Sequence, residues 1–217
     1  IKRDKATSNI CTAQVLLAVM AGMYAVYHGP KGLRHIALGV HSLATQTANG
    51  LKAAGVKVGA GQFFDTIHVT DVDCEAIKTS AEKLELNFNY INATSLSISF
   101  GENHTSAEVN AILSVFGAGQ NASEERTSSL NNAVLRTDAV LTHPTFSRFH
   151  SESKMMRYLK RLENKDLSLV HSMIPLGSCT MKLNAASELM PITNPQFSKI
   201  HPFAPLSQSK GYHEMFR

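Results

Sequence analysis

The sequence predicts a mixed α/β (α+β) fold: two long helices, then a small sheet with helices on one face. Up to about residue 55, apolar residues recur at spacings of three and four, as expected of helices. Beyond that point several short segments alternate with a period of two, as expected of strands. With 217 residues, 43% of them hydrophobic and 18% charged, the chain has the composition of a globular protein that can bury a core.

The first predicted helix runs through about Tyr27, and Thr7, Ser8 and Asn9 are its candidate N-caps. Its residues 13–27 are apolar nearly all around the helix, so we expect them to be buried on most sides. This run is shorter than the ~20 residues that a membrane span needs. Residues 28–30 (His-Gly-Pro) end this helix and start an amphipathic one that ends near residue 55.

Three strands are predicted in the following segment. The first covers residues 64–70 and places Ile67 and Val69 on one face. Two more, at residues 87–91 and 95–100, are separated by a turn at residues 92–94. With the helices between and after them, these strands favour a small α/β sandwich.

Capping residues place the helices of this segment. Asp71 or Asp73 can cap a helix that runs through about Leu84. Thr105 and Glu108 form the pattern of a capping box before a second apolar helix.

The remaining chain is predicted to hold a linker and a mostly helical or irregular segment. Residues 117–134 are polar, a helix covers residues 152–164, and four prolines keep the chain irregular after residue 190. Residues 211–217 resemble the start of a helix, and the first residue is not Met, so we expect a piece of a longer chain. The predicted organisation is a helical segment (1–55), a small α/β domain (56–116), a linker (117–134) and a C-terminal segment (135–217).

The candidate functional site is a turn in residues 171–184, which read His-Ser-Met-Ile-Pro-Leu-Gly-Ser-Cys-Thr-Met-Lys-Leu-Asn. Ser178 or Thr180 can cap a helix that opens at Met181, and a helix N-terminus attracts anions. Ser178, Thr180 and Lys182 are therefore candidates for contacts to a carboxylate or phosphate. The alternative is that Thr180 merely caps a helix and Lys182 is solvated.

Two further residues of this turn have competing interpretations. Cys179 can act as a nucleophile with His171 as its base, or it can be a buried packing residue. His171 is either an acid–base group or a hydrogen-bonded structural histidine. The three cysteines lack metal-ligand spacing and favour a reducing compartment. No histidine pairing or glycine-rich phosphate loop indicates a metal or nucleotide site.

The charge pattern argues against two classes of partner. The net charge of +4 is modest. A basic cluster at residues 154–165 can suggest nucleic acid, but without aromatic stacking residues it is better interpreted as a solvated helix face. The sequence therefore predicts neither nucleic-acid binding nor membrane insertion.

Several long, ordered strings resemble one known family, the P-protein (glycine dehydrogenase, decarboxylating) of the glycine cleavage system. Residues 171–184 resemble the signature at the start of the second half of that protein. The other matching strings lie at residues 5–14, 24–29, 141–144, 158–166, 191–193 and 201–203. The resemblance covers nearly the whole chain, and residues 56–136 match in general pattern.

The resemblance implies a pyridoxal-phosphate enzyme of the aspartate-aminotransferase-like fold (fold type I), built from two related halves. This chain would span the end of the first half and the start of the second. The cofactor serves as an electron sink for the decarboxylation of glycine, and the aminomethyl group passes to the lipoyl arm of H-protein. The family's Schiff-base lysine lies in a His-Lys string that has no match here, and the context of Lys182 differs. The resemblance thus implies no catalytic residue in this chain, and a piece that is inactive alone.

The implied partners are glycine, lipoyl-carrying H-protein, the remaining domains of the parent chain and further copies in a homo-oligomer. The implied location is the cytoplasm of a bacterium or the mitochondrial matrix of a eukaryote, not the secreted fraction. One alternative is a non-catalytic assembly module whose apolar helix at residues 13–27 serves interaction. Another is a thiol hydrolase, which predicts that Cys179 is alkylated faster than Cys11 and Cys74. As a fragment, the chain is expected to expose apolar surface and to self-associate.

Overall fold

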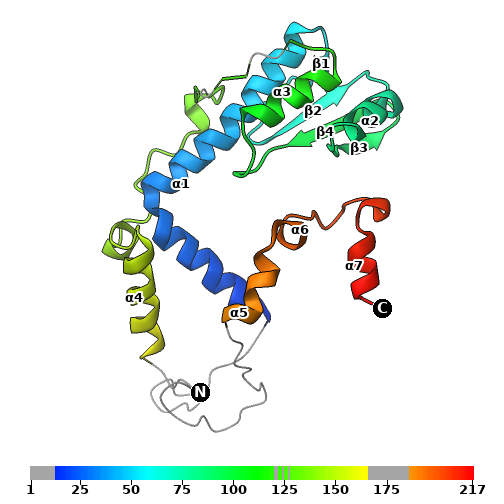
Figure 1. The fold of residues 1–217 in the computed structure, drawn as a ribbon. Helices are drawn as coiled ribbons and strands as arrows, with labels where there is room; N and C mark the ends of the chain where they lie inside the picture. The colour runs from blue at the N-terminus through cyan, green and yellow to red at the C-terminus, as the bar shows by residue number, and fades with distance from the viewer. Residues whose placement is uncertain (1–12, 120–121, 124, 127, 166–185) are drawn as a thin grey trace. The chain divides into compact units, whose positions relative to one another are not determined.

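The computed structural model describes residues 13–119, 122–123, 125–126, 128–165 and 186–217. These residues fall into two units, residues 13–165 and residues 186–217 (Figure 1). The α/β fold class is confirmed, because helices combine with a small antiparallel sheet. Among the described helices, none combines the length and the hydropathy needed to span a membrane.

Helix α1 (Ala13–Ala53) consists of two helices joined at a sharp bend. The bend lies at Gly29, whose backbone angles are φ 61° and ψ −178°, and Pro30 follows it. Glycine alone adopts this conformation readily, because a Cβ would clash with the backbone. The predicted break at residues 28–30 is therefore confirmed, and so is the end of the second helix near residue 55.

The prediction that residues 13–27 are buried on most sides is wrong for the described chain. Leu16 is 66% exposed, Leu17 67% and Met20 59%, and burial begins at Val26. In the described unit, packing against α1 starts only near its bend, where the 3-10 helix η3 (Pro144–Ser147) contacts it. The apolar composition correctly indicates a helix that needs cover, but this part of the chain does not supply that cover.

A four-stranded antiparallel sheet has the order β1-β2-β4-β3. Its strands are β1 (Lys57–Val58), β2 (Thr66–Thr70), β3 (Asn89–Asn92) and β4 (Ser95–Ser99). The three predicted strands are confirmed, with β3 and β4 joined by a hairpin. The two-residue β1 was not predicted, because a pair of residues carries no alternation to detect.

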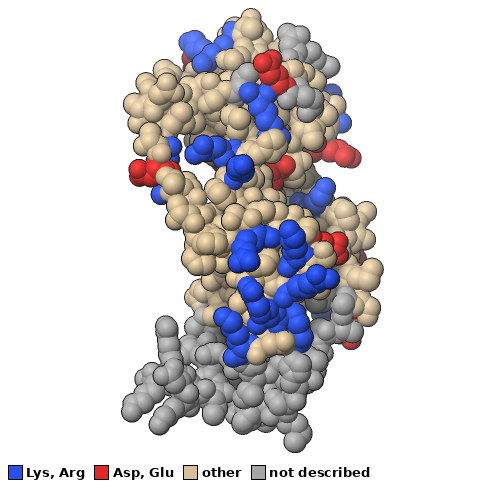
Figure 2. Space-filling model, turned by 90° about the vertical axis from the view of Figure 1, so that its left-hand side faces the viewer, with Lys and Arg blue, Asp and Glu red and all other residues tan. Residues whose placement is uncertain are grey.

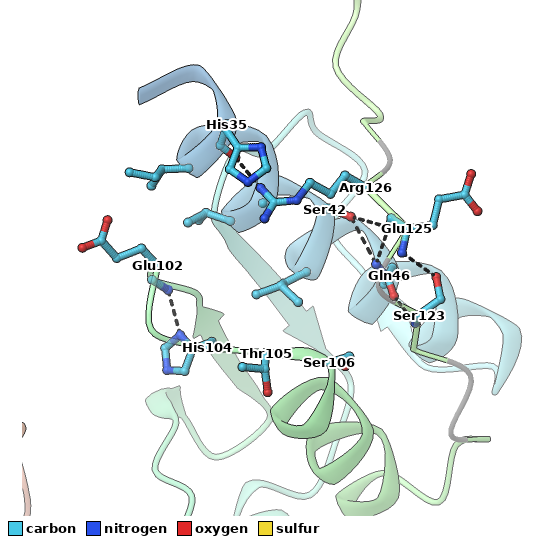
Figure 3. A pocket seen from close by; sticks show the side chains of 15 residues that line it. His35, Ser42, Gln46, Glu102, His104, Thr105, Ser106, Ser123, Glu125 and Arg126 are labelled. Carbon is cyan, nitrogen blue, oxygen red and sulfur yellow. Dashed lines mark hydrogen bonds between the residues drawn. The ribbon is translucent and has the colours of Figure 1, made fainter. Parts of the chain in front are cut away.

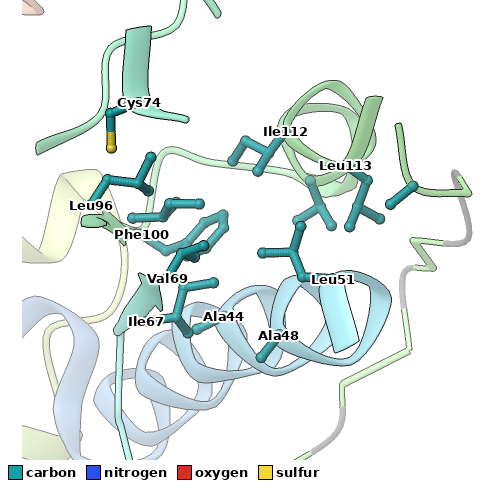
Figure 4. Packing of buried hydrophobic residues seen from close by; sticks show 13 residues of the cluster. Ala44, Ala48, Leu51, Ile67, Val69, Cys74, Leu96, Phe100, Ile112 and Leu113 are labelled. Atoms are coloured by element: carbon teal, nitrogen blue, oxygen red, sulfur yellow. The ribbon is translucent and has the colours of Figure 1, made fainter. Parts of the chain in front are cut away.

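The core lies between one face of this sheet and the helices that cover it (Figure 4). Ile67 and Val69 of β2 and Leu96 and Ile98 of β4 point into it, while the other face carries polar side chains. Three helices close the core: the C-terminal half of α1, helix α2 (Cys74–Glu82) and helix α3 (Ser106–Val115). This arrangement matches the predicted sheet with helices on one face.

Both helices after β2 begin at the predicted caps. The side chain of Asp73 accepts hydrogen bonds from the backbone N–H groups of Glu75 and Ala76, at 3.1 and 3.2 Å. At α3 the capping box is complete: the N–H of Thr105 donates to Glu108 at 2.8 Å, and the Thr105 side chain accepts from the backbone of the first turn. These contacts satisfy N–H groups that have no partner within the helix.

The capping box predicts a pH dependence of stability. The hydrogen bond from the Thr105 side chain, which the other cap contacts reinforce, lowers the pKa of Glu108 below its usual 4.5. A carboxyl whose pKa is depressed on folding stabilises the fold above the unfolded value and loses that contribution as the pH falls through the folded value. We expect Glu108→Gln to cost about 1 kcal/mol or less at pH 7. Urea titrations should show this difference shrinking as the pH falls below 4.5, whereas a difference that stays constant as the pH is lowered would contradict it.

After α3 the chain runs along α1 before the next helix forms. The 3-10 helix η2 (Asn132–Val134) follows this polar stretch, and η3 leads into helix α4 (Glu152–Glu163). Helix α4 matches the predicted helix at residues 152–164. Figure 2 shows Lys and Arg side chains gathered over this helix. The predicted domain boundaries themselves remain a prediction.

The unit of residues 186–217 consists of short helical turns: α5 (Ala186–Leu189), η4 (Met190–Thr193), α6 (Pro195–Ser198), η5 (Leu206–Gln208) and α7 (Lys210–Met215). The prolines predicted an irregular backbone here, and the structure shows a series of short helical turns. The helix predicted to begin in residues 211–217 is α7. The hydroxyl of Tyr212 donates to the carbonyl oxygen of Phe197, which ties α7 to α6.

Candidate functional site

The predicted site residues His171, Ser178, Cys179, Thr180 and Lys182 all lie in residues 166–185, outside the described residues. So does most of the helix expected to open at Met181. Their roles as contacts to a carboxylate or phosphate stay predictions. The site that the described residues do form lies elsewhere in the chain.

A pocket of about 250 Å³ with both polar and apolar lining residues lies between α1, the loop after β4 and residues 123, 125 and 126 (Figure 3). Helix α1 supplies one wall through His35, Ser42 and Gln46. The loop after β4 and the start of α3 supply the opposite wall, which includes Glu102, His104, Thr105 and Ser106. The stretch with Ser123, Glu125 and Arg126 closes the remaining side. The pocket therefore joins three segments that are distant in the sequence.

Gln46 uses both ends of its amide to hold the backbone of Ser123 and Glu125. Its carbonyl oxygen accepts from the N–H of Ser123 at 2.8 Å, and its NH₂ group donates to the carbonyl oxygen of Glu125 at 3.2 Å. Ser42, one helical turn earlier, donates to the same carbonyl oxygen at 3.2 Å. These bonds place the polar stretch against α1 and fix its backbone there.

Arg126 reaches back to the helix and donates to the carbonyl oxygen of His35. Gly39 allows this approach, because a Cβ there would lie 2.7 Å from a guanidinium nitrogen of Arg126. Figure 3 shows this side chain lying across the top of the pocket toward His35. The guanidinium thus fastens the stretch to α1 at a second point.

On the opposite wall, two contacts order the loop after β4. Nδ1 of His104 accepts from the N–H of Gly101 at 2.8 Å. The hydroxyl of Tyr24 donates to the carboxylate of Glu102, whose side chain points away from the pocket in Figure 3. This hydrogen bond, with smaller effects of burial and of the negative charge, raises the pKa of Tyr24 to about 12. Tyr24 is therefore a neutral donor at physiological pH.

A buried histidine lies beside the pocket, where its neighbours fix its tautomer. Nδ1 of His41 lies 2.7 Å from the carbonyl oxygen of Phe64, which can only accept, so Nδ1 carries the proton. Nε2 then accepts from the N–H of Ser129 at 3.0 Å. His41 also stacks on the Phe64 ring. It is thus a structural residue that links α1 to Phe64, which precedes β2, and to Ser129, which follows α3.

The interactions that the lining residues of this pocket make are hydrogen bonds that hold the backbone in place. Its described lining residues include no lysine and no cysteine, so they offer neither a Schiff base nor a thiolate. Cys74, the described cysteine, is buried elsewhere, and burial raises the pKa of its thiol. Among the described residues, no group of His, Cys, Asp and Glu side chains is arranged to hold a metal ion. The pocket functions as a junction that fixes three segments.

Sequence reasoning did not single out Ser42, Gln46 or Arg126. Ser42 and Gln46 are one turn apart on α1, so the available signal was a polar pair on the face of an otherwise apolar helix. That signal indicates a polar contact but not its partner, which is 77 or more residues away.

A family model described as "Glycine cleavage system P-protein" matches residues 1–116, more than half of the chain. The chain belongs to the glycine cleavage system P-protein family. The resemblance seen in the sequence is therefore confirmed, and α1, the sheet and α3 all lie within the matched residues.

Relatives in this family match the chain from end to end. A protein of Flavobacterium johnsoniae named glycine dehydrogenase (decarboxylating) is 56% identical over 223 residues, which cover 100% of this chain and 23% of that protein. A mitochondrial glycine dehydrogenase (decarboxylating) of Arabidopsis thaliana is 49% identical and covers 100% of this chain and 22% of its own length. The chain thus spans about a quarter of the length of these P-protein relatives.

Proposed function

We propose that this chain is part of a glycine dehydrogenase (decarboxylating) that releases CO₂ from glycine and transfers the aminomethyl group to the lipoyl arm of H-protein. The observation that carries the proposal is the identity of 49–56% to proteins of that name across the whole chain. The parent would be a homo-oligomer in the bacterial cytoplasm or in the mitochondrial matrix. The bacterial relatives and the relatives named mitochondrial support these two locations.

The described residues do not fit a pyridoxal-phosphate site. The described lining of the pocket has no lysine for a Schiff base, and its arginine is committed to a backbone carbonyl oxygen. We therefore assign the cofactor to parts of the parent outside the described residues. In this division of labour, the described unit contributes a rigid bent helix and a capped sheet domain that support the rest of the enzyme.

The test compares the 217-residue chain with the full-length parent protein. Glycine labelled with ¹⁴C in its carboxyl group, pyridoxal phosphate and lipoylated H-protein are supplied to each. We expect labelled CO₂ from the full-length protein and none above background from the chain. Two outcomes would contradict the proposed reaction. One is release of labelled CO₂ at the same rate with and without lipoylated H-protein, and the other is no release by the full-length protein.

A trapping experiment tests where the cofactor lies. After incubation with pyridoxal phosphate and reduction with borohydride, mass spectrometry should find no stoichiometrically modified lysine in the chain. In the full-length protein it should find one, outside these 217 residues. Stoichiometric modification of Lys182 would overturn the assignment of the cofactor to other parts of the parent.

A second candidate function, a non-catalytic assembly module, is favoured by one observation. Leu16, Leu17 and Met20 expose an apolar surface on the first half of α1. Surfaces of this kind are covered by a partner or by another domain. Sedimentation of the chain alone should show self-association that Leu16→Lys with Met20→Lys abolishes; an unmodified chain that sediments as a monomer would exclude this role.

A further inference from the structure

Helix α4 carries basic side chains along one side. Lys154, Arg157 and Arg161 follow one another at steps of three and four residues, which places them on one face of the helix, and Lys165 follows in the turn after it. Lys160 borders this stripe, and Arg148 lies in the turn before the helix. All six side chains are exposed, and they form the basic face of α4, visible in Figure 2.

Few acidic groups balance this charge. Glu163 forms an ion pair with Lys160 at 2.9 Å on the border of the stripe. With the residues that the structure describes, Lys154, Arg157 and Lys165 form no ion pair. Among the described residues, the centre of the basic face is therefore positively charged and exposed.

A solvated helix face needs charge, but it does not need charge of one sign. Like charges three or four residues apart destabilise a helix by roughly 0.2–0.5 kcal/mol per pair. Lys154 also lies in the first turn, where a positive charge opposes the helix dipole. These like charges act against α4, whereas Arg161 in its last turn complements the helix dipole, and binding of an anionic partner would relieve the repulsion.

One of these cations is already held in position for binding. The guanidinium carbon of Arg161 lies 5.2 Å from the ring centre of Tyr158 and 5.6 Å from that of Phe149. The two rings stack on each other with centres 4.2 Å apart. Stacking of this kind restricts the arginine side chain, so less entropy is lost when its planar fork binds a carboxylate.

The same contacts favour a protein partner over a nucleic acid. Phe149 and Tyr158 stack on each other and are half-buried, so they offer no free platform for bases. From Lys154 to Arg161 the stripe is about 10 Å long, at 1.5 Å per residue, which is the scale of a patch on a single protein. We propose that the basic face of α4 docks the carboxylate-bearing surface of an acidic protein. On the proposed function, this partner is the lipoyl-carrying protein.

The experiment uses the full-length enzyme with the substitutions Lys154→Glu, Arg157→Glu and Lys165→Glu. Arg161 is left unchanged because it packs on two rings. The Kd for the lipoyl-carrying protein, measured by titration calorimetry, should rise by roughly tenfold or more, and its dependence on salt should weaken. The kcat at saturating partner should change less than twofold.

The matched control reverses three exposed lysines elsewhere, Lys52→Glu, Lys78→Glu and Lys83→Glu, which changes the net charge equally. It should bind the partner as the unmodified enzyme does. An equal loss of affinity in both variants would show that only the net charge matters and would overturn the docking site. Loss of affinity for duplex DNA, rather than for the protein, would also overturn it, in favour of a nucleic-acid surface.

Two further measurements keep the outcomes distinct. Circular dichroism tests whether each variant folds. The neutral variant Lys154→Gln, Arg157→Gln, Lys165→Gln should give a Kd between those of the unmodified enzyme and the charge-reversed variant. The change in cofactor absorbance when glycine is added requires no protein partner and should be the same in all variants. If the unmodified enzyme shows no such change, the proposed function fails; if it does and the Kd is unaltered by charge reversal, the docking site fails.

Discussion

Replacing Gly29 with alanine should raise the hydrogen-exchange rates of the backbone amides on either side of the α1 bend by about 100-fold. This corresponds to a local loss of roughly 3 kcal/mol. Two causes act together. The backbone at φ 61° and ψ −178° is one that only glycine adopts at low cost. A Cβ there would also lie 2.4 Å from the carbonyl oxygen of Phe146 and 2.7 Å from Cε1 of His150.

Gly22→Ala is the matched control, because it lies in the same helix with open space around its Cβ position. That substitution should leave exchange unchanged or slow it, since alanine favours a helix interior by up to ~1 kcal/mol over glycine. Adding His150→Ala to Gly29→Ala should restore only part of the protection from hydrogen exchange. The closer clash of the new Cβ is with the backbone carbonyl oxygen of Phe146, which His150→Ala does not remove. Equal exchange in the Gly29→Ala and Gly22→Ala variants would refute the steric account.

Replacing Leu51 with alanine should lower the free energy of unfolding of the sheet unit by roughly 3 kcal/mol. Leu51 is 0% exposed and lies in the core shown in Figure 4, on the turn of α1 next to Gly50. A Cβ at Gly50 would be 2.6 Å from Cδ2 of Leu113, so α1 and α3 are in close contact here. Helices packed so tightly cannot move to fill the space that a lost isobutyl group leaves.

Urea unfolding followed by circular dichroism measures this loss. Leu38→Ala, the same change on the same helix at a side chain that is 37% exposed, should cost less than about 1 kcal/mol. Similar costs for the two variants would show that Leu51 does not pack as described.

Local signals in the sequence predicted most of the elements of the sheet unit. Asp73 and the Thr105–Glu108 pair act within a few residues, so their caps follow directly from the sequence. Alternation placed Ile67 and Val69 on the buried face for the same reason. The break at Gly29 was also predictable, because a Gly-Pro pair interrupts a helix wherever it occurs.

Features that depend on distant partners were not predictable in this way. The contacts that the polar stretch after α3 makes with Gln46 and Ser42 of α1, about 80 residues earlier in the chain, are one example. The burial expected for residues 13–27 failed for a similar reason. An apolar composition indicates that a helix surface is to be buried, but it does not indicate which part of the protein buries it.

The contact between His150 and the α1 bend also bears on the order in which the chain folds, because it joins residues far apart in the sequence. Nδ1 of His150 donates to the carbonyl oxygen of Tyr27 at 2.6 Å, across a separation of 123 residues. Strands β3 and β4 pair across only a few residues, so their loop-closure entropy is much smaller. The hairpin and its helices can therefore fold while the chain around Gly29 is still unrestrained. The bend can gain its contact with His150 only once the chain through residue 150 has been synthesised.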